Sequence, residues 1–196
     1  MGKKPLNENQ VKTLRKLVSD KPLHSLLLNL GCDLMLRSSD LLKLKVSDVM
    51  NESGTPKTEV KVKQKKTGKT TLSIPLSQNS TRVIKKHLSE RQLTDFIFSG
   101  QMSHFTRKPI SSQQYVKIFK NWMRSLGVED VSQYSTHSIR KSKPTLFITR
   151  LRMWMQYDGS LDNPPSLQHL RIWEPQMNPV WILRGQSTSE SERIIK

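Results

Sequence analysis

Apolar residues recur at helical spacing in the first part of the chain. Residues 7–10 look like a capping box, in which an Asn and a Gln side chain bond the first backbone N–H groups of a helix. Apolar positions three and four residues apart then predict a surface helix with one buried face. That face consists of Val11, Leu14, Leu17 and Val18.

The next apolar stretch is rich in leucine and almost free of charge. It runs from Leu23 to Leu36, and a helix with so few polar positions is expected to be buried. Ser38 or Ser39 can cap a further short helix by accepting a backbone hydrogen bond. That helix would hold Leu41, Leu42 and Leu44.

Two alternating segments after Gly54 and Pro56 predict a β-hairpin. Valines alternate with lysines over residues 60–63, and apolar residues alternate with polar ones over residues 72–76. The turn-like residues 66–69 lie between them, which is typical of two antiparallel strands. The apolar positions are Val60, Val62, Leu72, Ile74 and Leu76.

Helical spacing returns after the hairpin. Residues 79–91 predict a helix that turns Val83, Ile84 and Leu88 inward, and residues 96–98 predict a short buried strand. The clearest helix starts at residues 111–114. Its apolar stripe, expected to be core rather than a platform for stacking bases, consists of Tyr115, Ile118, Phe119, Trp122 and Leu126.

Two capping residues mark the helices of the second half. Gly127 sits where a helix commonly ends with a left-handed residue. Thr136 is placed to cap the helix that contains His137 and Arg140.

Composition changes after Leu146. Residues 1–146 carry 27 of the 33 basic side chains and 11 of the 16 acidic ones, whereas residues 147–196 carry six and five. The later segment also has three of the four tryptophans and no sustained period. We therefore expect one mainly helical α+β domain with a small antiparallel sheet over residues 1–146, followed by an irregular, poorly ordered tail over residues 147–196.

A formal net charge of +17 points to a polyanionic partner. Lysine and arginine release counterions when they neutralise phosphates, which favours nucleic acid over a merely soluble or ribosomal-type basic surface. The single cysteine, Cys32, excludes an internal disulfide and a cysteine zinc cage, and it fits a reducing cytoplasm. No signal peptide opens the sequence and no apolar run is long enough for a membrane span, so no membrane partner is expected.

Some of the basic residues are of the types that phosphodiester cleavage without a metal requires. Cations must surround a phosphorus whose oxygens gain charge, and a guanidinium donates two hydrogen bonds while it stays charged. A lysine or histidine must protonate the leaving 5′ oxygen, and a nucleophile must attack in line. The candidates are Arg37, Lys66, His137 and Arg140, and neither a metal nor another cofactor is expected.

The first two candidates also have ordinary interpretations. Arg37 can be a helix-terminal arginine paired with Asp40 three residues later. Lys66 competes for its role with Lys65 and Lys69, in a segment that is also consistent with a run of solvated charges.

The His-x-x-Arg spacing of the other two places both side chains on one face of a helix. This suits two groups that meet at one phosphate, although the bare pattern is weak. In the order arginine box, lysine hairpin, His-x-x-Arg box, the segments together resemble the tyrosine recombinases, the phage integrase family. The resemblance covers about residues 5–146 and implies the recombinase catalytic fold. The sequence is similar to short single-domain integrases, which have no separate amino-terminal DNA-clamping domain.

The resemblance implies a role for each residue. Arg37 and Arg140 would clamp the phosphate, with Asp40 orienting Arg37. Lys66 would donate a proton to the leaving oxygen, and His137 would assist in acid–base catalysis. Neighbouring lysines are expected to contact double-stranded DNA, namely Lys63, Lys65, Lys69, Lys141 and Lys143.

The nucleophile of the family is a tyrosine near its carboxyl end, after a third cationic contact. Tyr157 follows Arg140 too soon for that role, Tyr115 lies on the apolar stripe, and Tyr134 immediately precedes the His box. We therefore expect this sequence to lack an in-frame nucleophile.

A shifted reading frame accounts for this absence. Suppose that one base has been lost after the Leu146 codon. New codons then form when the last base of each codon is joined to the first two bases of the next. These codons permit a helical segment that contains LLGQ and ATSAYLG and is similar to the last boxes of the family. Met and Trp have one codon each, so Met153-Trp154 forces Val and Trp154-Met155 forces Asp. Trp173-Glu174 likewise forces the glycine of YLG. A natural, divergent tail is the alternative.

The function that the resemblance implies is site-specific DNA recombination and integration through a covalent 3′-phosphotyrosyl intermediate, as in mobile elements. For this sequence we expect DNA binding without strand exchange. The family forms its active complexes on DNA by exchanging carboxy-terminal segments, so a homo-oligomer on DNA is a further expectation. The alternatives are a non-enzymatic DNA-binding regulator, a basic RNA-binding protein and a decayed, unstable product.

Overall fold

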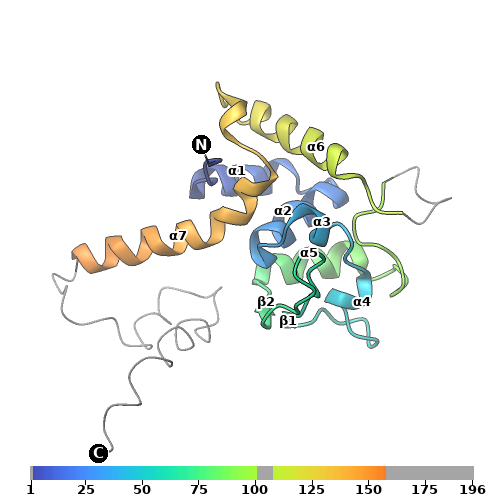
Figure 1. Cartoon of the computed structure of the whole chain (residues 1–196). Coiled ribbons are helices and arrows are strands. Elements are labelled where there is room, and N and C mark those ends of the chain that lie inside the picture. Colours follow the sequence, from blue (N-terminus) through green and yellow to red (C-terminus); the bar gives the residue numbers. More distant parts are fainter. Residues whose placement is uncertain (1, 101–107, 158–196) are drawn as a thin grey trace, which may run out of the picture. The chain divides into compact units, whose positions relative to one another are not determined.

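The computed structural model describes residues 2–100 and 108–157. The chain divides into two compact units, Met1–Arg152 and Met153–Lys196, and the first holds every element below except the end of the last helix. Helices predominate, and the described residues contain one sheet of two strands (Figure 1). The predicted fold class, mainly helical with a small antiparallel sheet, is confirmed. No helix in the described ranges is long and apolar enough to cross a membrane.

Helix α1 spans Glu8–Leu17 and begins with the predicted capping box. The Asn7 Oδ1 accepts the Gln10 N–H at 2.8 Å, and the Gln10 Oε1 accepts the Asn7 N–H at 2.9 Å. The predicted buried face is confirmed at Val11, Leu14 and Val18. It is wrong at Leu17, which is 45% exposed because the helix turns that position outward in its last turn.

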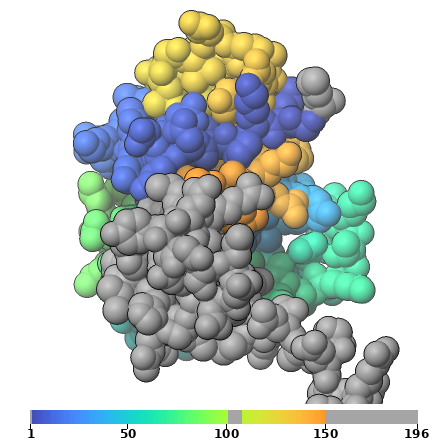
Figure 2. Space-filling model, turned by 90° about the vertical axis from the view of Figure 1, so that its left-hand side faces the viewer, coloured from blue at the N-terminus to red at the C-terminus, as the bar shows by residue number. Residues whose placement is uncertain are grey.

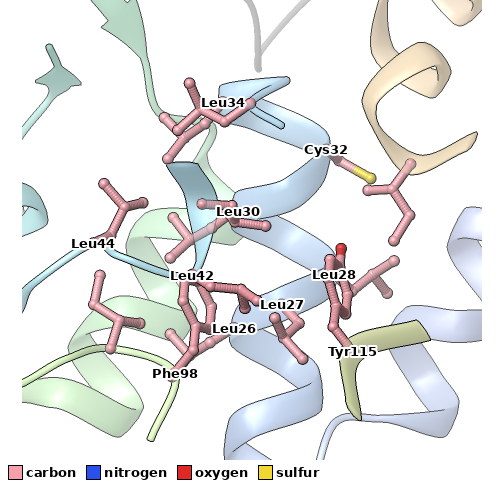
Figure 3. Packing of buried hydrophobic residues seen from close by; sticks show 14 of the residues in the cluster. Leu26, Leu27, Leu28, Leu30, Cys32, Leu34, Leu42, Leu44, Phe98 and Tyr115 are labelled. Atoms are coloured by element: carbon pink, nitrogen blue, oxygen red, sulfur yellow. The ribbon is translucent and has the colours of Figure 1, made fainter. Parts of the chain in front are cut away.

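Helix α2, Pro22–Leu34, is the centre of the core, as its lack of charge predicts. Every residue from Ser25 to Leu34 is buried. The helix contacts α1, strand β2 (Ile74–Pro75) and helices α3 (Ser38–Leu41) and α5 (Gln78–Leu88). Figure 3 shows its leucines pointing to several sides, with Leu42 and Phe98 on one side and Tyr115 on another. Burial raises the pKa of the Cys32 thiol to about 12, so this cysteine serves as packing.

The turn after α2 forces one residue into a left-handed conformation. Met35 has φ 51° and ψ 28°, and it is the one non-glycine residue with positive φ in the described part of the chain. Helix α3 follows at once, with Arg37 at its N-cap position. The prediction that Ser38 or Ser39 caps this helix is wrong, because Arg37 occupies the N-cap position and Ser38 is already the first residue of the helix.

The predicted hairpin forms, with short strands. Strand β1, Glu59–Val60, pairs antiparallel with β2 so that Val60 lies opposite Ile74, and an isolated bridge joins Lys63 to Thr70. Gly68 supplies a positive φ of 66° in the connecting turn. Leu72 is 57% exposed instead of buried, because it lies outside the two paired residues of β2.

Residues 96–98, between α5 and α6, were predicted to form a short buried strand. Phe96 forms only an isolated bridge with Lys45, next to the short helix α4 (Val46–Val49), so the prediction of a strand at residues 96–98 is wrong. Ile97 and Phe98 are nevertheless core residues, and the Ile97 N–H donates to the Leu44 carbonyl. Helix α5 turns Ile84 and Leu88 into the core, as predicted, but ends before Arg91.

Helix α6 spans Ser112–Ser125 and is capped by Ser111, whose hydroxyl accepts the Gln114 N–H. Its aromatic stripe is core, as predicted, with Leu126 partly buried at its end and Gly127 at φ 68°. The Trp122 Nε1–H donates to Nδ1 of His24 at 3.2 Å. Burial and the nearby Lys21 lower the pKa of His24, which keeps that nitrogen free to accept.

The last described helix, α7, spans Thr136–Tyr157 and follows the short 3-10 helix η2 (Val131–Gln133). It contains Pro144 and continues past Leu146. Residues 147–157 are therefore helical where composition predicts an irregular tail, because no glycine or proline interrupts them. The rest of that predicted tail, residues 158–196, lies outside the described residues.

The strained turn gives a direct test. A non-glycine residue in the left-handed region costs roughly 1–2 kcal/mol, so replacing Met35 by glycine should remove that strain while it also loses the side chain. The matched control is Met35→Ala, which loses the side chain and keeps the strain. We expect Met35→Gly to be more stable than Met35→Ala by about 1 kcal/mol in urea unfolding. Equal or reversed stabilities would mean that the turn is relaxed.

Candidate functional site

Arg37 lies at the junction of α2 and α3 and is held from the hairpin. Its side chain is half-buried, and its Nη1–H donates to the Gln64 Oε1 at 3.2 Å. Gln64 lies just before the lysine-rich turn and itself donates its backbone N–H to the Lys69 carbonyl. The first predicted arginine and the predicted lysine turn are therefore joined by a direct contact.

The Asp40 side chain binds the lysine-rich turn instead of the Arg37 side chain that it was expected to orient. Its side chain is buried, and Oδ1 accepts the backbone N–H of Lys65 at 3.1 Å. Within the described residues the ion pairs are Lys12–Glu8 and Lys143–Asp33, so Arg37 and Asp40 are not paired. The Asp40 backbone N–H donates to the Arg37 carbonyl at 2.9 Å, but the two side chains are connected only indirectly, through the hairpin that both of them bind.

The lysines of the hairpin are exposed. Lys63, Lys65, Lys66 and Lys69 all have solvent-facing side chains, and Lys66 lies at the turn itself. A depression of about 400 Å³ lies beside the hairpin. Its charged lining consists of Lys43, Lys61, Lys63, Lys65, Asp40 and Asp48. This side of the molecule presents more positive than negative charge.

His137 and Arg140 lie in the first turns of α7, as predicted. The helix starts at Thr136, and the preceding Ser135 caps it by accepting the His137 N–H at 3.2 Å. The prediction that Thr136 is the cap is therefore wrong by one residue. His137 is exposed and Arg140 is half-buried, and their spacing puts them on one face of the helix.

The start of α7 packs on the end of α2 that leads to Arg37. A Cβ placed on Gly31 would lie 3.0 Å from Cγ2 of Ile139, so the absence of a side chain at Gly31 lets the two helices pack closely. Ile139 is 1% exposed. The residue before Arg140 is thus a core contact, and the structure brings the segments that carry Arg37 and Arg140 to the same end of α2.

The amino-terminal residues brace α7 as well. The Leu6 N–H donates to the Ser142 hydroxyl at 3.1 Å, and that hydroxyl donates to the Ser138 carbonyl at 2.8 Å. The Lys4 N–H donates to the Gln133 carbonyl at 2.9 Å. Figure 2 shows the amino-terminal residues (blue) lying against the segment around η2 (yellow).

The two lysines predicted to contact DNA from α7 both have partners within the chain. The exposed Lys141 donates through Nζ to the Lys3 carbonyl at 3.1 Å. Lys143 is turned inward, with Nζ 3.4 Å from Oδ1 of Asp33. Sequence reasoning missed Asp33 and Gln64, because a single polar residue inside a leucine-rich helix or beside a lysine run carries no local signal of its distant partner.

The tyrosines differ in their access to solvent. Tyr115 is 1% exposed, and burial together with the nearby Cys32 raises the pKa of its hydroxyl. Tyr134 is partly buried against the core. Tyr157 ends α7, and its side chain lies outside the described residues. In the described ranges, no three His, Cys, Asp or Glu side chains gather as a metal site would require.

Comparison with known proteins gives a consistent result. The model of the phage integrase family matches residues 4–149. The probable integrase/recombinase YoeC of Bacillus subtilis (strain 168) is 30% identical over 112 residues, which is 57% of this chain and 55% of that protein. The chain thus spans about half the length of this curated relative.

Solved structures show the same fold. The XerA recombinase superposes with a TM-score of 0.59 at 16% identity, covering 94% of this chain and 65% of that one. A lambda integrase bound to DNA has a TM-score of 0.55 at 17% identity, covering 85% and 60%.

Asp40 can be tested with two substitutions. Asp40→Asn retains an oxygen that can accept the Lys65 N–H, whereas Asp40→Ala leaves that N–H without its partner. Because an unsatisfied part-buried donor costs about 1–3 kcal/mol, we expect Asp40→Ala to lower the free energy of unfolding more than Asp40→Asn. Faster hydrogen exchange at the Lys65 amide should accompany the loss. Equal damage from both substitutions would show that the carboxylate charge, and not the hydrogen bond, matters.

Proposed function

Because the chain belongs to the phage integrase family, we propose that it binds double-stranded DNA through a phosphate pocket made of Arg37, Lys66, His137 and Arg140. We also propose that it does not exchange strands as its sequence stands. The observation that supports the pocket best is the packing of Ile139 on Gly31, since it fixes the helix of Arg140 against the end of α2 that leads to Arg37. We extend the proposal to a role in mobile DNA. The protein would act in the cytoplasm, with several copies assembled on the DNA recombination site.

Each member of the phosphate pocket supplies what a phosphodiester needs. Arg37 has one N–H engaged by Gln64, and a guanidinium has five N–H donors, so others remain for phosphate oxygens. Arg140 is half-buried, which limits the dielectric screening of its charge. Lys66 is exposed at a turn, where it can reach a leaving oxygen, and the exposed His137 lies beside Arg140 on α7.

The proposed inactivity rests on the tyrosines. A nucleophilic tyrosine must reach a phosphorus and lose its proton, but the Tyr115 hydroxyl is buried with a raised pKa. Tyr134 packs partly on the core, and Tyr157 follows Arg140 by less than the family spacing. We propose that the loss of one base after the Leu146 codon, which puts the following codons out of frame, explains why the nucleophile is missing.

DNA binding tests the phosphate pocket. Arg140→Ala should weaken binding of a duplex roughly 10- to 100-fold at fixed salt, because a hydrogen bond to a charged group contributes about 1.5–3 kcal/mol. Lys117→Ala, at an exposed position of α6, is the charge-matched control and should have a smaller effect. Fluorescence anisotropy with duplex DNA and with structured RNA at the same salt separates the classes of partner. Equal effects of the two substitutions would favour a non-enzymatic basic surface.

Covalent trapping tests the missing nucleophile. A nicked suicide duplex should give no protein–DNA adduct with this chain. An adduct should appear when residues 147–196 are replaced by the segment read in the other frame, and it should disappear again when the tyrosine of YLG is changed to phenylalanine. Denaturing gel electrophoresis with labelled DNA measures the adduct. An adduct from the unchanged chain would contradict the proposed inactivity, and coding DNA that cannot spell the recovered segment would exclude the frameshift.

A further inference from the structure

We propose that Asp33 and Lys143 are positioning residues, which hold the helix of Arg140 in register with the end of α2 that leads to Arg37, and that Lys143 does not itself contact DNA. This inference rests on the proposed phosphate pocket. It changes the expected role of Lys143 from a DNA contact to an internal support.

The first argument is the burial of the Asp33 carboxylate. The side chain of Asp33 is 5% exposed, and a buried carboxylate is costly unless it is paired and hydrogen-bonded. Oδ2 accepts the Ser77 N–H at 2.8 Å, at the amino end of α5, and Oδ1 lies 3.4 Å from Nζ of Lys143. Asp33 therefore joins three helices, α2, α5 and α7, and Lys143 is its one cationic partner within the described residues.

The second argument is the low accessibility of Lys143. Its side chain is 19% exposed and its ammonium group points to Asp33. To reach a phosphate it would have to leave Asp33 as an unpaired buried charge, and removal of one partner of a buried pair is strongly unfavourable. A DNA contact by Lys143 would therefore be opposed by the interaction that the fold already makes.

The third argument is the place of the pair on α2 and α7, close in the sequence to the two arginines. Asp33 precedes Arg37 by four residues, and Lys143 follows Arg140 by three, so that Arg140 and Lys143 are about 60° apart around α7. Ile139 and Lys143, four residues apart, face α2 at Gly31 and Asp33. The apolar contact sets how closely the helices approach. The ion pair adds a second point, which fixes how far α7 is rotated and shifted along α2.

The test compares three variants in duplex binding at several salt concentrations: Asp33→Asn, Lys143→Met and the double variant. Asparagine keeps an oxygen for the Ser77 N–H and removes only the charge. If the pair positions the pocket, each single change should weaken binding roughly 3- to 10-fold. The double variant should be no weaker than the weaker single one, because both changes break one interaction.

The direction of the Asp33→Asn effect decides between the two roles. Removing a negative charge from a DNA-binding protein should by itself tighten binding. If Lys143 instead contacts a phosphate, Asp33→Asn should strengthen binding by releasing the lysine, and Lys143→Met should lower the salt slope by about 1. Tighter or unchanged binding by Asp33→Asn would overturn the positioning role.

Matched controls keep the result interpretable. Asp20→Asn and Lys117→Met change the same charges at exposed positions, and they report the bulk electrostatic effect alone. Thermal unfolding shows whether each variant folds. If Lys143→Met does not fold, because it leaves Asp33 unpaired, Asp33→Asn and the double variant still decide the question.

Hydrogen exchange separates a failure of this inference from a failure of the proposed function. The amides of residues 137–143 should exchange faster in Asp33→Asn than in the unchanged chain, with little change in α6. If the unchanged chain does not bind duplex DNA, the proposed function fails, but the exchange data still show whether the ion pair holds α7. Unchanged exchange at these amides would overturn the inference whatever the DNA result.

Discussion

The burial of helix α2 from Ser25 onward is the constraint on which the rest of the structure depends. From Ser25 to Leu34 this helix has no exposed side, so every neighbouring element must supply apolar surface or a hydrogen-bond partner. Its few polar residues show this. Asn29 donates to the Ser25 carbonyl and accepts from Arg15, and Asp33 is held by Ser77 and Lys143. Where α2 ends, the strained Met35 turns the chain so that Arg37 leaves the core half-exposed.

The sequence predicts this architecture well wherever one local pattern decides the outcome. The capping box at Asn7, the buried stretch that became α2, the α6 stripe and the hairpin around Gly68 all follow from residues a few positions apart. Errors occur where a distant contact decides. Phe96 and its neighbours are as apolar as a strand, but they pair only through the isolated bridges Lys45–Phe96 and Ser99–Pro109 and single backbone hydrogen bonds. Leu17 fits the helical period, yet no neighbour covers it.

The candidate site follows the same division. The residue types of Arg37, Lys66, His137 and Arg140, and their order along the chain, can be seen in the sequence. The supports cannot, because Gln64 meets Arg37 across 27 residues, and Lys143 meets Asp33 across 110. Lys143 is the instructive case. A lysine one turn after a predicted phosphate-binding arginine suggests a second DNA contact, and only the burial of Asp33 reveals a competing partner inside the chain.

Few basic side chains in the described residues form ion pairs with acidic ones. The sequence carries 33 basic and 16 acidic side chains, but the described residues form just two ion pairs within 4 Å. Most basic side chains in that part of the chain therefore form no ion pair, and their like charges oppose compaction by self-repulsion. One of the two pairs, Lys143 with Asp33, joins α7 to α2 and so supplies an attractive contact between these helices against that repulsion.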